Sequence, residues 1–305
     1  MNPHQDWSTS SFDLAPLAPA TGPFPKRQWL RTWWTHRGRG ELLLADDGAG
    51  LVPLTLHESR LSLAGEADLT DYHTPLGSSS GTALAAAVAS LPKGTSIALD
   101  SLPQEAATVV AESLQAAGLE TRVEQHNIAA VLRLPDSFDT YLAGLAKKER
   151  HEFRRKRRRF DNELGTGVVE RRFGPEAVAL FAKLHRLSSG DKGAFMTEPM
   201  EEFFLSLHLE AGGVIDVLLD GSGRPASAVF SFEDENGFYL YNSAFEPELR
   251  KHSPGNVMLS HLIERAIGDG VPIFDFLKGD ETYKLRLGAV PRPLFVVTAE
   301  TGGKP

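Results

Sequence analysis

The order of apolar and polar residues along the chain predicts an α/β protein. Segments in which apolar residues recur every three or four positions alternate with short apolar runs that end in Gly, Pro, Asn or Asp, which is typical of helices alternating with strands. In the first half we expect helix 25–34, strands 41–45 and 51–56, helix 82–91, strand 96–100, helix 104–117 and one or two strands within 121–133. This order predicts helices layered on a sheet.

The residues Pro135, Asp136 and Ser137 interrupt this pattern. We expect a domain boundary there, which gives one half over 12–135 and another over 136–300. The second half is expected to contain helices 138–164, 176–187 and 198–209, strands 214–219, 225–232 and 238–244, helix 257–267 and a strand from Ile273. An Asn-Gly pair between the last two of the three consecutive strands is a strong hairpin signal.

Composition and charge limit the classes of function. The chain has 305 residues and a net charge of −8, which argues against DNA as a partner. It contains no cysteine, which excludes disulfides, a thiol nucleophile and cysteine-ligated zinc, and its histidines show no metal-ligand spacing. The start of the chain lacks the basic and apolar parts of a leader, and no apolar run reaches the roughly 18 residues of a membrane span. We therefore expect a cytoplasmic protein without a metal site or a membrane span.

The segment 138–164 combines an apolar stripe with an ordered row of cations. The stripe is formed by Phe138, Leu142, Leu145, Phe153, Phe160 and Leu164. The cations beside it are Lys147, Arg150, Arg154 and either Arg157 or Arg158, at spacings of three and four. Three interpretations stay open: a solvated basic face, an arginine clamp for phosphate or carboxylate, and a nucleic-acid surface, which the acidic total disfavours.

The stretch from Val271 to Gly288 carries the densest candidate chemistry. Asp275 interrupts an apolar strand, and a buried carboxylate is costly unless it is paired or used. Asp280 follows in the turn after the strand, and Tyr283 and Lys284 come within about one helical turn of it. The segment therefore offers candidate bases, a phenol and a cation at the end of a strand. An ion pair between Asp275 and a nearby cation is the structural alternative to catalysis.

This stretch, VPIFDFLKGDETYKLRLG, resembles the DFxxGDxxYKxxxG signature of the CelD/BcsL-like acyltransferases, a branch of the GNAT and FemAB superfamily. The basic segment SFDTYLAGLAKKERHEFRRKRRRF is similar to the helix FxxYLxxLxKKxRxxxRRxxRxL of the same family. The resemblance covers about residues 24–298. It implies an α/β fold of two tandem GNAT-like halves, with mixed central sheets flanked by helices around a shared groove. The first half shows no phosphate loop and is expected to be the degenerate one.

The resemblance implies an N-acyltransferase. The acyl group would pass from acyl-CoA, a co-substrate and not a bound cofactor, to an amine on a small molecule or glycan, such as a sugar or cell-envelope precursor. In the second half, a strand, a glycine-containing loop and a helix start would present backbone N–H groups and a positive dipole end to the CoA phosphates. A Pro-Gly helix start without any ligand is the alternative. The expected donor contacts are Tyr241, Ser243, Ser253, Gly255, Asn256 and Val257.

The resemblance also implies catalytic roles. Backbone N–H groups of the third strand would polarise the thioester carbonyl, Asp275 or Asp280 would accept the amine proton, and Tyr283 would protonate the leaving thiolate. The expected acceptor contacts are Lys147, Arg150, Arg154, Lys284 and Tyr72, the last on a predicted strand over 68–76. His185, which lies beside apolar residues of its helix, is expected to be a packed residue and not a ligand.

Three other functions are weighed against this one. A Fem-type ligase that uses aminoacyl-tRNA would give the basic helix an RNA partner. A protein that binds acyl-CoA or a glycan without turnover would keep the same sites. A hydrolase is suggested by the G-x-S-x-G pattern around Ser79, but that motif needs a buried strand before it, and Thr74-Pro75 is a poor end for one.

Overall fold

The computed structural model describes residues 7–302. By their internal packing these residues form two units, one of residues up to Ala129 together with those from Arg292 onward, and one of Ala130–Pro291. From the sequence, the second half was expected to be one segment over 136–300. The packing differs because two long strands, β5 (Arg122–Arg133) and β11 (Val290–Glu300), run from one unit into the other.

The first unit is a sheet with helices packed on it. Its elements are η1 (Ser10–Asp13), α1 (Arg27–Arg37), β1 (Glu41–Asp46), β2 (Leu51–His57), β3 (Arg60–Leu63), α2 (Ser80–Ala89), β4 (Ser96–Pro103), α3 (Gln104–Ala116) and parts of β5 and β11. The strand order is β1-β2-β3-β4-β11-β5. Helix α2 packs on α3, β1 and β2, and together they bury one continuous apolar core. Apart from a strand over 68–76, the predicted helices and strands of this half are found, and β3 is an additional strand that was not predicted.

The predicted strand over 68–76 is wrong. This segment is irregular, and only Leu76 forms isolated bridges, to Pro16 and Leu51. Its polar groups bond elsewhere instead of pairing as a strand: the backbone N–H of His73 donates to the carbonyl of Ser101, and Thr74 accepts from the backbone N–H of Ala18. Buried backbone and side-chain groups need such partners, and here they are Ser101 of β4 and Ala18 of a loop.

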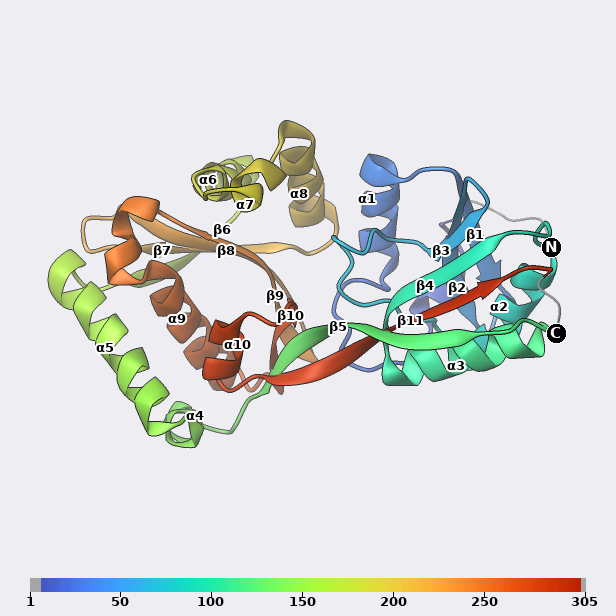
Figure 1. Cartoon of the computed structure of the whole chain (residues 1–305). Coiled ribbons are helices and arrows are strands. Elements are labelled where there is room, and N and C mark those ends of the chain that lie inside the picture. Colours follow the sequence, from blue (N-terminus) through green and yellow to red (C-terminus); the bar gives the residue numbers. More distant parts are fainter. Residues whose placement is uncertain (1–6, 303–305) are drawn as a thin grey trace. The chain divides into compact units, whose positions relative to one another are not determined.

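The second unit is a mixed sheet between two layers of helices (Figure 1). Its elements are α4 (Phe138–Gly144), α5 (Lys147–Leu164), β6 (Val168–Arg172), α6 (Pro175–Arg186), α7 (Asp191–Phe195), α8 (Glu198–Glu210), β7 (Val214–Leu219), β8 (Pro225–Asp234), β9 (Gly237–Phe245), η2 (Pro247–His252), α9 (Pro254–Gly268), β10 (Ile273–Lys278) and α10 (Thr282–Arg286). The strand order is β10-β9-β8-β7-β6, with β10 parallel to β9 and the other neighbours antiparallel. The predicted α/β fold class with mixed sheets flanked by helices is confirmed.

The two faces of this sheet have different coverings. Helices α6, α7 and α8 lie over one face, and α9, with α4 and α5 packed against it, covers the other (Figure 1). On the α6 side, Phe181, Phe204 and Phe230 form an aromatic cluster. On the α9 side, Phe153 and Phe160 of α5 enter the larger apolar core. The order β7-β8-β9-α9-β10 therefore appears as predicted, with β6 as an additional edge strand.

The single long helix predicted over 138–164 is wrong. Helix α4 ends at Gly144, Leu145 takes the extended conformation (φ −71°, ψ 147°), and α5 begins at Lys147. Glycine is a poor helix former, and the break lets Leu145 stay buried in the core. The apolar periodicity continues across the break, which is why the pattern alone looked like one helix. The break also creates the groove between α4 and α5 that is described below.

Candidate active site

The strands β9 and β10 leave regular pairing near the middle of the sheet. They pair in parallel through Phe238 with Phe274 and Tyr239 with Asp275. Beyond this point the register between β8 and β9 shifts, so that Tyr241 is an additional residue in β9, which is a β-bulge. In β10, Leu277 has a φ of 59°, in the left-handed region that residues other than glycine seldom adopt. Both distortions interrupt the regular pairing of the strands. They lie at the place where a ligand would fit between β9 and β10.

The N-terminus of α9 follows β9 through η2 and is surrounded by cations. Ser253 lies in the left-handed conformation (φ 55°, ψ 47°), and Pro254 occupies the first helical position, where a missing N–H costs nothing. Lys156 of α5 donates a hydrogen bond of 2.9 Å to Asn256 Oδ1. Arg159 donates to the carbonyl of Lys251, at 3.1 Å. The positive end of the helix dipole and these cations together favour an anion at this point.

Gly255 leaves room for that anion. A Cβ atom built at Gly255 would meet only the ring of Phe245, at 3.9 Å. Its φ is not in the left-handed region, so no backbone constraint demands a glycine here. The open side of this residue is therefore a place where a ligand can approach the backbone closely.

A cavity of about 230 Å³ connects this helix start with α5 and α10. It is lined by Lys148, Glu149, Glu152, Phe153, Lys156, Asn256, Tyr283, Arg286 and Leu287. Burial lowers the pKa of Lys156. Partial burial, with a smaller effect from the Glu281 carboxylate, raises the pKa of Tyr283, so its phenol stays protonated at neutral pH. The ring of Tyr283 lies edge-on to Phe276 of β10, at 6.2 Å between centroids.

The turn after β10 uses several of the predicted site residues to fix its own shape. Asp275, which is fully buried, accepts a hydrogen bond of 2.8 Å from the backbone N–H of Leu277, the residue with positive φ. Lys284 is 2% exposed, and its ammonium donates to the carbonyl of Lys278 at 2.5 Å and, at longer distances, to those of Leu277 and Gly279. It also pairs with Glu281 at 2.9 Å.

Lys284 is therefore turned inward, and its ammonium contacts the carbonyls of the turn. Its expected contact with an acceptor stays a prediction. Asp280 is exposed in the same turn. The structure thus brings Asp275, Lys284 and Tyr283 together around the end of β10, as the sequence analysis expected, but it gives the first two a structural environment.

His185 on α6, which was expected from the sequence to be a packed residue, lies buried beside β9. It is 1% exposed, and its Nε2 lies 3.0 Å from Asn242 Oδ1 on β9, directly after the bulge. Asn242 Oδ1 also accepts from the backbone N–H of Ser243, at 2.8 Å, so that N–H is already used inside the protein. If Nε2 donates to Asn242, Nδ1 carries the lone pair, and within residues 7–302 Nδ1 has no hydrogen-bond partner.

The surroundings of His185 keep it neutral. Burial, assisted by the positive charges of Lys192 and Arg186, lowers its pKa to about 4, against a weaker opposing effect of Asn242. Lys192 lies on α7 and is exposed. Neighbouring atoms partly desolvate its ammonium, which lowers its pKa, and the carboxylate of Glu281 weakens this effect. The only sequence signal for this group was the position of His185 on the apolar face of its helix, which is equally typical of a packed histidine.

The predicted acceptor clamp lies elsewhere. Lys147, Arg150 and Arg154 line a different groove, between α4 and α5, and not the cavity at the start of α9. Arg150 donates to the carbonyls of Leu142 and Ala143, at 3.3 and 3.1 Å, and so caps the end of α4. Tyr72 belongs to the first unit, where it is fully buried against Phe24, with the guanidinium of Arg292 over its ring at 4.9 Å.

The G-x-S-x-G segment has a structural explanation. Ser79 follows an irregular segment, and its hydroxyl donates a hydrogen bond of 2.6 Å to Asp47 in the turn between β1 and β2. This bond, with backbone N–H donors, lowers the pKa of Asp47. The buried strand that a nucleophile elbow requires is missing before Ser79.

Residues 147–285 match the family model of the acetyltransferase (GNAT) domain. The second unit contains a GNAT domain. The match begins at the first residue of α5 and ends in α10, so it includes the bulged strand, the start of α9 and Tyr283. A GNAT-type acyltransferase domain therefore carries the cavity and the His185–Asn242 pair. No curated protein matches the chain.

Solved structures share the fold of the whole chain. FemX is similar with a TM-score of 0.61 at 13% identity, over 96% of this chain and 96% of that chain. The L-PGS of Bacillus licheniformis is similar with a TM-score of 0.60 at 12% identity, over 90% and 92%. A conserved protein of unknown function from Bacteroides thetaiotaomicron VPI-5482 is similar with a TM-score of 0.64 at 11% identity, over 97% and 95%. At such identities the similarity shows the fold alone. The chain as a whole, including the GNAT domain, shares the fold of these solved structures.

Two further observations concern the described residues. Between residues 7 and 302, no helix combines the length and the apolar character needed to cross a bilayer. In the same range, no cluster of three or more His, Asp or Glu side chains that could hold a metal ion is found. The N-terminal residues on which the absence of a leader was judged lie partly outside the described range, at 1–6.

Proposed function

We propose that the GNAT domain transfers an acyl group from acyl-CoA to an amine. The observation that carries this proposal is the start of α9, where Gly255 leaves the backbone open and Lys156 reaches Asn256 beside Tyr283 in one cavity. The CoA phosphates would bind the helix start, because backbone N–H groups, the helix dipole and Lys156 all favour anions there. The acyl-bearing arm would then extend between β9 and β10, where the bulge and the positive φ of Leu277 break the regular ladder.

The opposite face of the sheet would receive the acceptor. His185 of α6 and Asn242 of β9 meet on that face, where the ring of Phe195 on α7 lies 5.7 Å from that of His185. In the proposed reaction the amine nitrogen attacks the thioester carbonyl carbon, a C–N bond forms, and the C–S bond breaks. The backbone of β9 at Tyr241 would meet the carbonyl oxygen as it becomes negative. The amine proton passes to Nδ1 of neutral His185, directly or through water, and the phenol of Tyr283 gives its proton to the leaving thiolate.

The roles of the other predicted residues change with this assignment. We propose that Asp275 is a positioning residue, because its carboxylate fixes the backbone of Leu277. Lys284 would fix the same turn through its carbonyl contacts. Asp280 stays a prediction as an alternative base, since it is exposed close to Tyr283. Ser243, Ser253 and Val257 stay predicted donor contacts.

We further propose a sugar or cell-envelope precursor as the acceptor, and membership in the CelD/BcsL-like branch. Both rest on the sequence motifs, the DFxxGDxxYKxxxG segment above all. A cytoplasmic location would give the protein access to acyl-CoA, and the absence of cysteines suits a reducing compartment.

Release of free thiol from acetyl-CoA, measured with a panel of amino sugars, tests the reaction. Binding is tested separately by thermal unfolding with CoA and with acetyl-CoA. Both ligands should raise the melting temperature by several degrees at a hundredfold excess over Kd, because the phosphates and not the acyl group are held. Gly255→Glu should remove the shift, since it places a negative side chain at the phosphate position.

A matched control lies at the other end of the same helix. A Cβ atom at Gly268 would meet nothing within 4 Å, so Gly268→Glu adds the same charge without touching the site and should keep the shift. Absence of any shift with millimolar CoA in the wild-type protein would refute the donor assignment, and turnover with aminoacyl-tRNA would then identify a ligase. Binding without turnover of any donor would identify a non-catalytic binding protein.

A further inference from the structure

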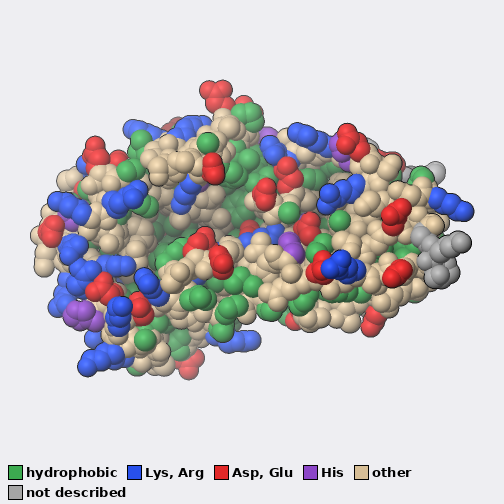
Figure 2. All heavy atoms as spheres, in the orientation of Figure 1, with side chains coloured by type: hydrophobic (Ala, Val, Ile, Leu, Met, Phe, Trp, Pro, Cys, Tyr) green, Lys and Arg blue, Asp and Glu red, His purple; other side chains and the backbone are tan. Residues whose placement is uncertain are grey.

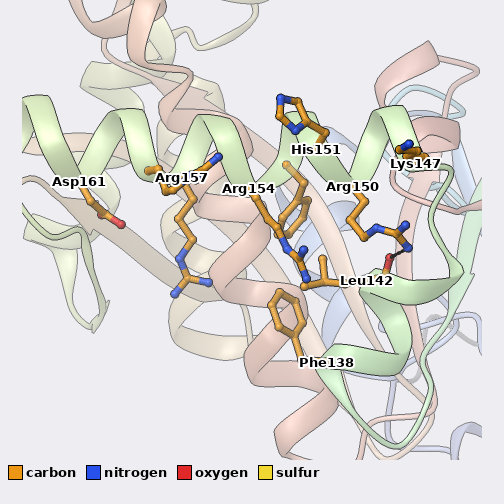
Figure 3. A pocket seen from close by; sticks show the side chains of 10 residues that line it. Phe138, Leu142, Lys147, Arg150, His151, Arg154, Arg157 and Asp161 are labelled. Atoms are coloured by element: carbon orange, nitrogen blue, oxygen red, sulfur yellow. Dashed lines mark hydrogen bonds between the residues drawn. The ribbon is translucent and has the colours of Figure 1, made fainter.

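A second concave surface lies between α4 and α5, outside the proposed reaction site. This groove encloses about 550 Å³. Its lining residues are Phe138, Leu142, Lys147, Arg150, His151, Phe153, Arg154, Arg157, Arg158 and Asp161. Figure 3 shows Arg154 extending from α5 toward Phe138 and Leu142 of α4. The groove exists because the chain breaks at Leu145 and folds α4 back beside α5.

The cations of the groove point away from the donor cavity, although Phe153 lines both. Arg154 lines the groove, and Lys156 lines the cavity. Two residues along a helix correspond to a rotation of about 200°, so the two side chains leave α5 on nearly opposite sides. The groove cations therefore cannot be explained as part of the binding site for the CoA phosphates.

Much of the positive charge in the groove is not neutralised. Arg150 is used to cap α4, and Arg157 pairs with Glu264 at 2.6 Å. Among residues 7–302, the side chains of Lys147, His151, Arg154 and Arg158 form no hydrogen bond or ion pair. Asp161 is the acidic residue of the lining. In Figure 2, Lys and Arg side chains gather on the part of the surface where α5 lies, although the whole chain carries a net charge of −8.

The arrangement of charge and apolar surface indicates the shape of the occupant. The cations from Lys147 to Arg158 follow successive turns of one helix and span about 16 Å along its axis. They form a line and do not converge on one point, so they suit an extended partner better than a small ion. Beneath them lie Phe138, which is partly exposed, and Leu142 and Phe153, which are nearly buried, and together they form an apolar floor. An apolar group of a partner would contact this floor mainly at Phe138.

We propose that this groove binds an acidic amphipathic helix of a partner protein. Apolar side chains at spacings of three and four would lie on Phe138 and Leu142, and carboxylates on either side would pair with Lys147, Arg154 and Arg158. A flat bilayer surface could not reach the floor of a concave groove. A nucleic acid would meet the cations but would be opposed by the net charge of −8 of the chain.

A designed peptide tests the proposal on the full chain. The probe is a fluorescein-labelled peptide of about 18 residues, long enough to form a helix, with Leu at i, i+3, i+4 and i+7 and Glu on the flanks. Its binding, followed by fluorescence anisotropy, should be saturable. A scrambled peptide of the same composition should bind at least about tenfold more weakly, because it cannot place its leucines on one face.

Variants locate the binding. Arg154→Glu with Arg158→Glu should weaken binding of the helical peptide by at least about tenfold, since each lost charged hydrogen bond alone is worth that much. Both residues are exposed, so the fold should survive, and an unchanged melting temperature checks this. Lys148→Glu, a charge reversal on the other side of α5, should leave peptide binding unchanged.

Three results would overturn the proposal. Equal binding of the scrambled peptide would show that charge alone is recognised. Tighter binding of a single-stranded RNA of similar length would assign the groove to nucleic acid. Undiminished peptide binding by the double arginine variant would place the peptide elsewhere on the protein.

Discussion

Lys156 of α5 and Asn256 of α9 are joined by a hydrogen bond of 2.9 Å, although they lie a hundred residues apart in the chain. The bond brings the basic helix to the start of the helix that follows β9. It places a partly buried ammonium beside the backbone N–H groups of α9, at the point where an anion is favoured.

The first prediction concerns this ammonium. Lys156→Met should weaken binding of acetyl-CoA by roughly 10- to 150-fold, since a hydrogen bond to a charged group is worth about 1.5–3 kcal/mol. Titration calorimetry measures the change, and Lys183→Met, at an exposed position on α6, should have no effect. Burial lowers the pKa of Lys156. As the pH rises, acetyl-CoA binding should therefore begin to weaken at a lower pH than it would if this lysine were exposed. Unchanged affinity in Lys156→Met would separate this residue from the donor site.

Tyr283 should act on the chemical step and not on binding. Its raised pKa keeps the phenol protonated over the physiological range, as a general acid requires. Tyr283→Phe should lower kcat by about 100-fold and leave the Kd of acetyl-CoA unchanged. Steady-state kinetics with calorimetry separate the two effects. A Phe variant with normal kcat would reduce Tyr283 to a packing residue of the cavity.

His185 should make folding stability depend on pH. Its pKa is about 4 in the folded protein, below the ordinary value of 6.5 for an exposed histidine, so the unfolded chain binds more protons between these values. Stability should therefore fall as the pH drops from 6.5 toward 4, and rise again on return. His185→Gln should remove this dependence in urea unfolding measured across that range. His57→Gln, at an exposed position on β2, should leave it intact.

The same histidine should shape the pH profile of the reaction. With its folded pKa near 4, His185 is already deprotonated at neutral pH, so the acidic limb of the kcat/KM profile that it causes should have its midpoint near 4 and not near 6.5. His185→Gln should lower kcat by about 100-fold or more. If the variant His185→Gln kept the wild-type kcat/KM profile, the base would be another residue.

Asp216 should be a stability residue of the GNAT domain. It is fully buried, and Arg265 donates two hydrogen bonds to it at 2.8 and 2.6 Å, with Arg171 at 3.4 Å. Asp216→Ala should cost about 3–5 kcal/mol of unfolding free energy, because it leaves a partly buried guanidinium without its main partner. Chemical denaturation measures it. Glu170→Ala breaks the exposed pair with Arg172 and should cost at most about 1 kcal/mol; an equal cost for both would contradict the argument.

A variant of Arg150 can distinguish two roles of this residue. The sequence predicts a clamp for an anionic acceptor, whereas the structure shows a cap at the end of α4. Arg150→Ala should lower stability by about 1 kcal/mol, because the carbonyls of Leu142 and Ala143 lose a charged donor. The KM of the acceptor amine should not change. A raised acceptor KM with unchanged stability would instead support the anionic clamp that the spacing of the cations predicts.

The sequence by itself determined the local structure and the class of domain. Periodicity and turn residues located β7, β8, β9 and α9 to within a few residues, because each is set by its own apolar pattern and by glycine, proline or asparagine at its ends. The DFxxGDxxYKxxxG segment pointed to acyltransfer before any contact was known, and the family match over residues 147–285 agrees with that class.

Only the tertiary structure decided which side chains meet. The spacing of Lys147, Arg150 and Arg154 shows that they share a helix face, but not that this face lines a groove away from the start of α9. Asn256, the partner of Lys156, lies a hundred residues later in the chain, so the local periodicity of the sequence could not predict this contact.

The sequence also did not predict the break at Leu145 or the contacts of single site residues. The apolar pattern runs through Leu145 without interruption, whereas the backbone there turns so that α4 can pack against its neighbours. A histidine on an apolar helix face looks the same whether it is packed or functional. His185 became a candidate base only when folding placed Asn242 at its Nε2 and left its Nδ1 buried, because pKa and hydrogen bonding depend on neighbours that the fold supplies.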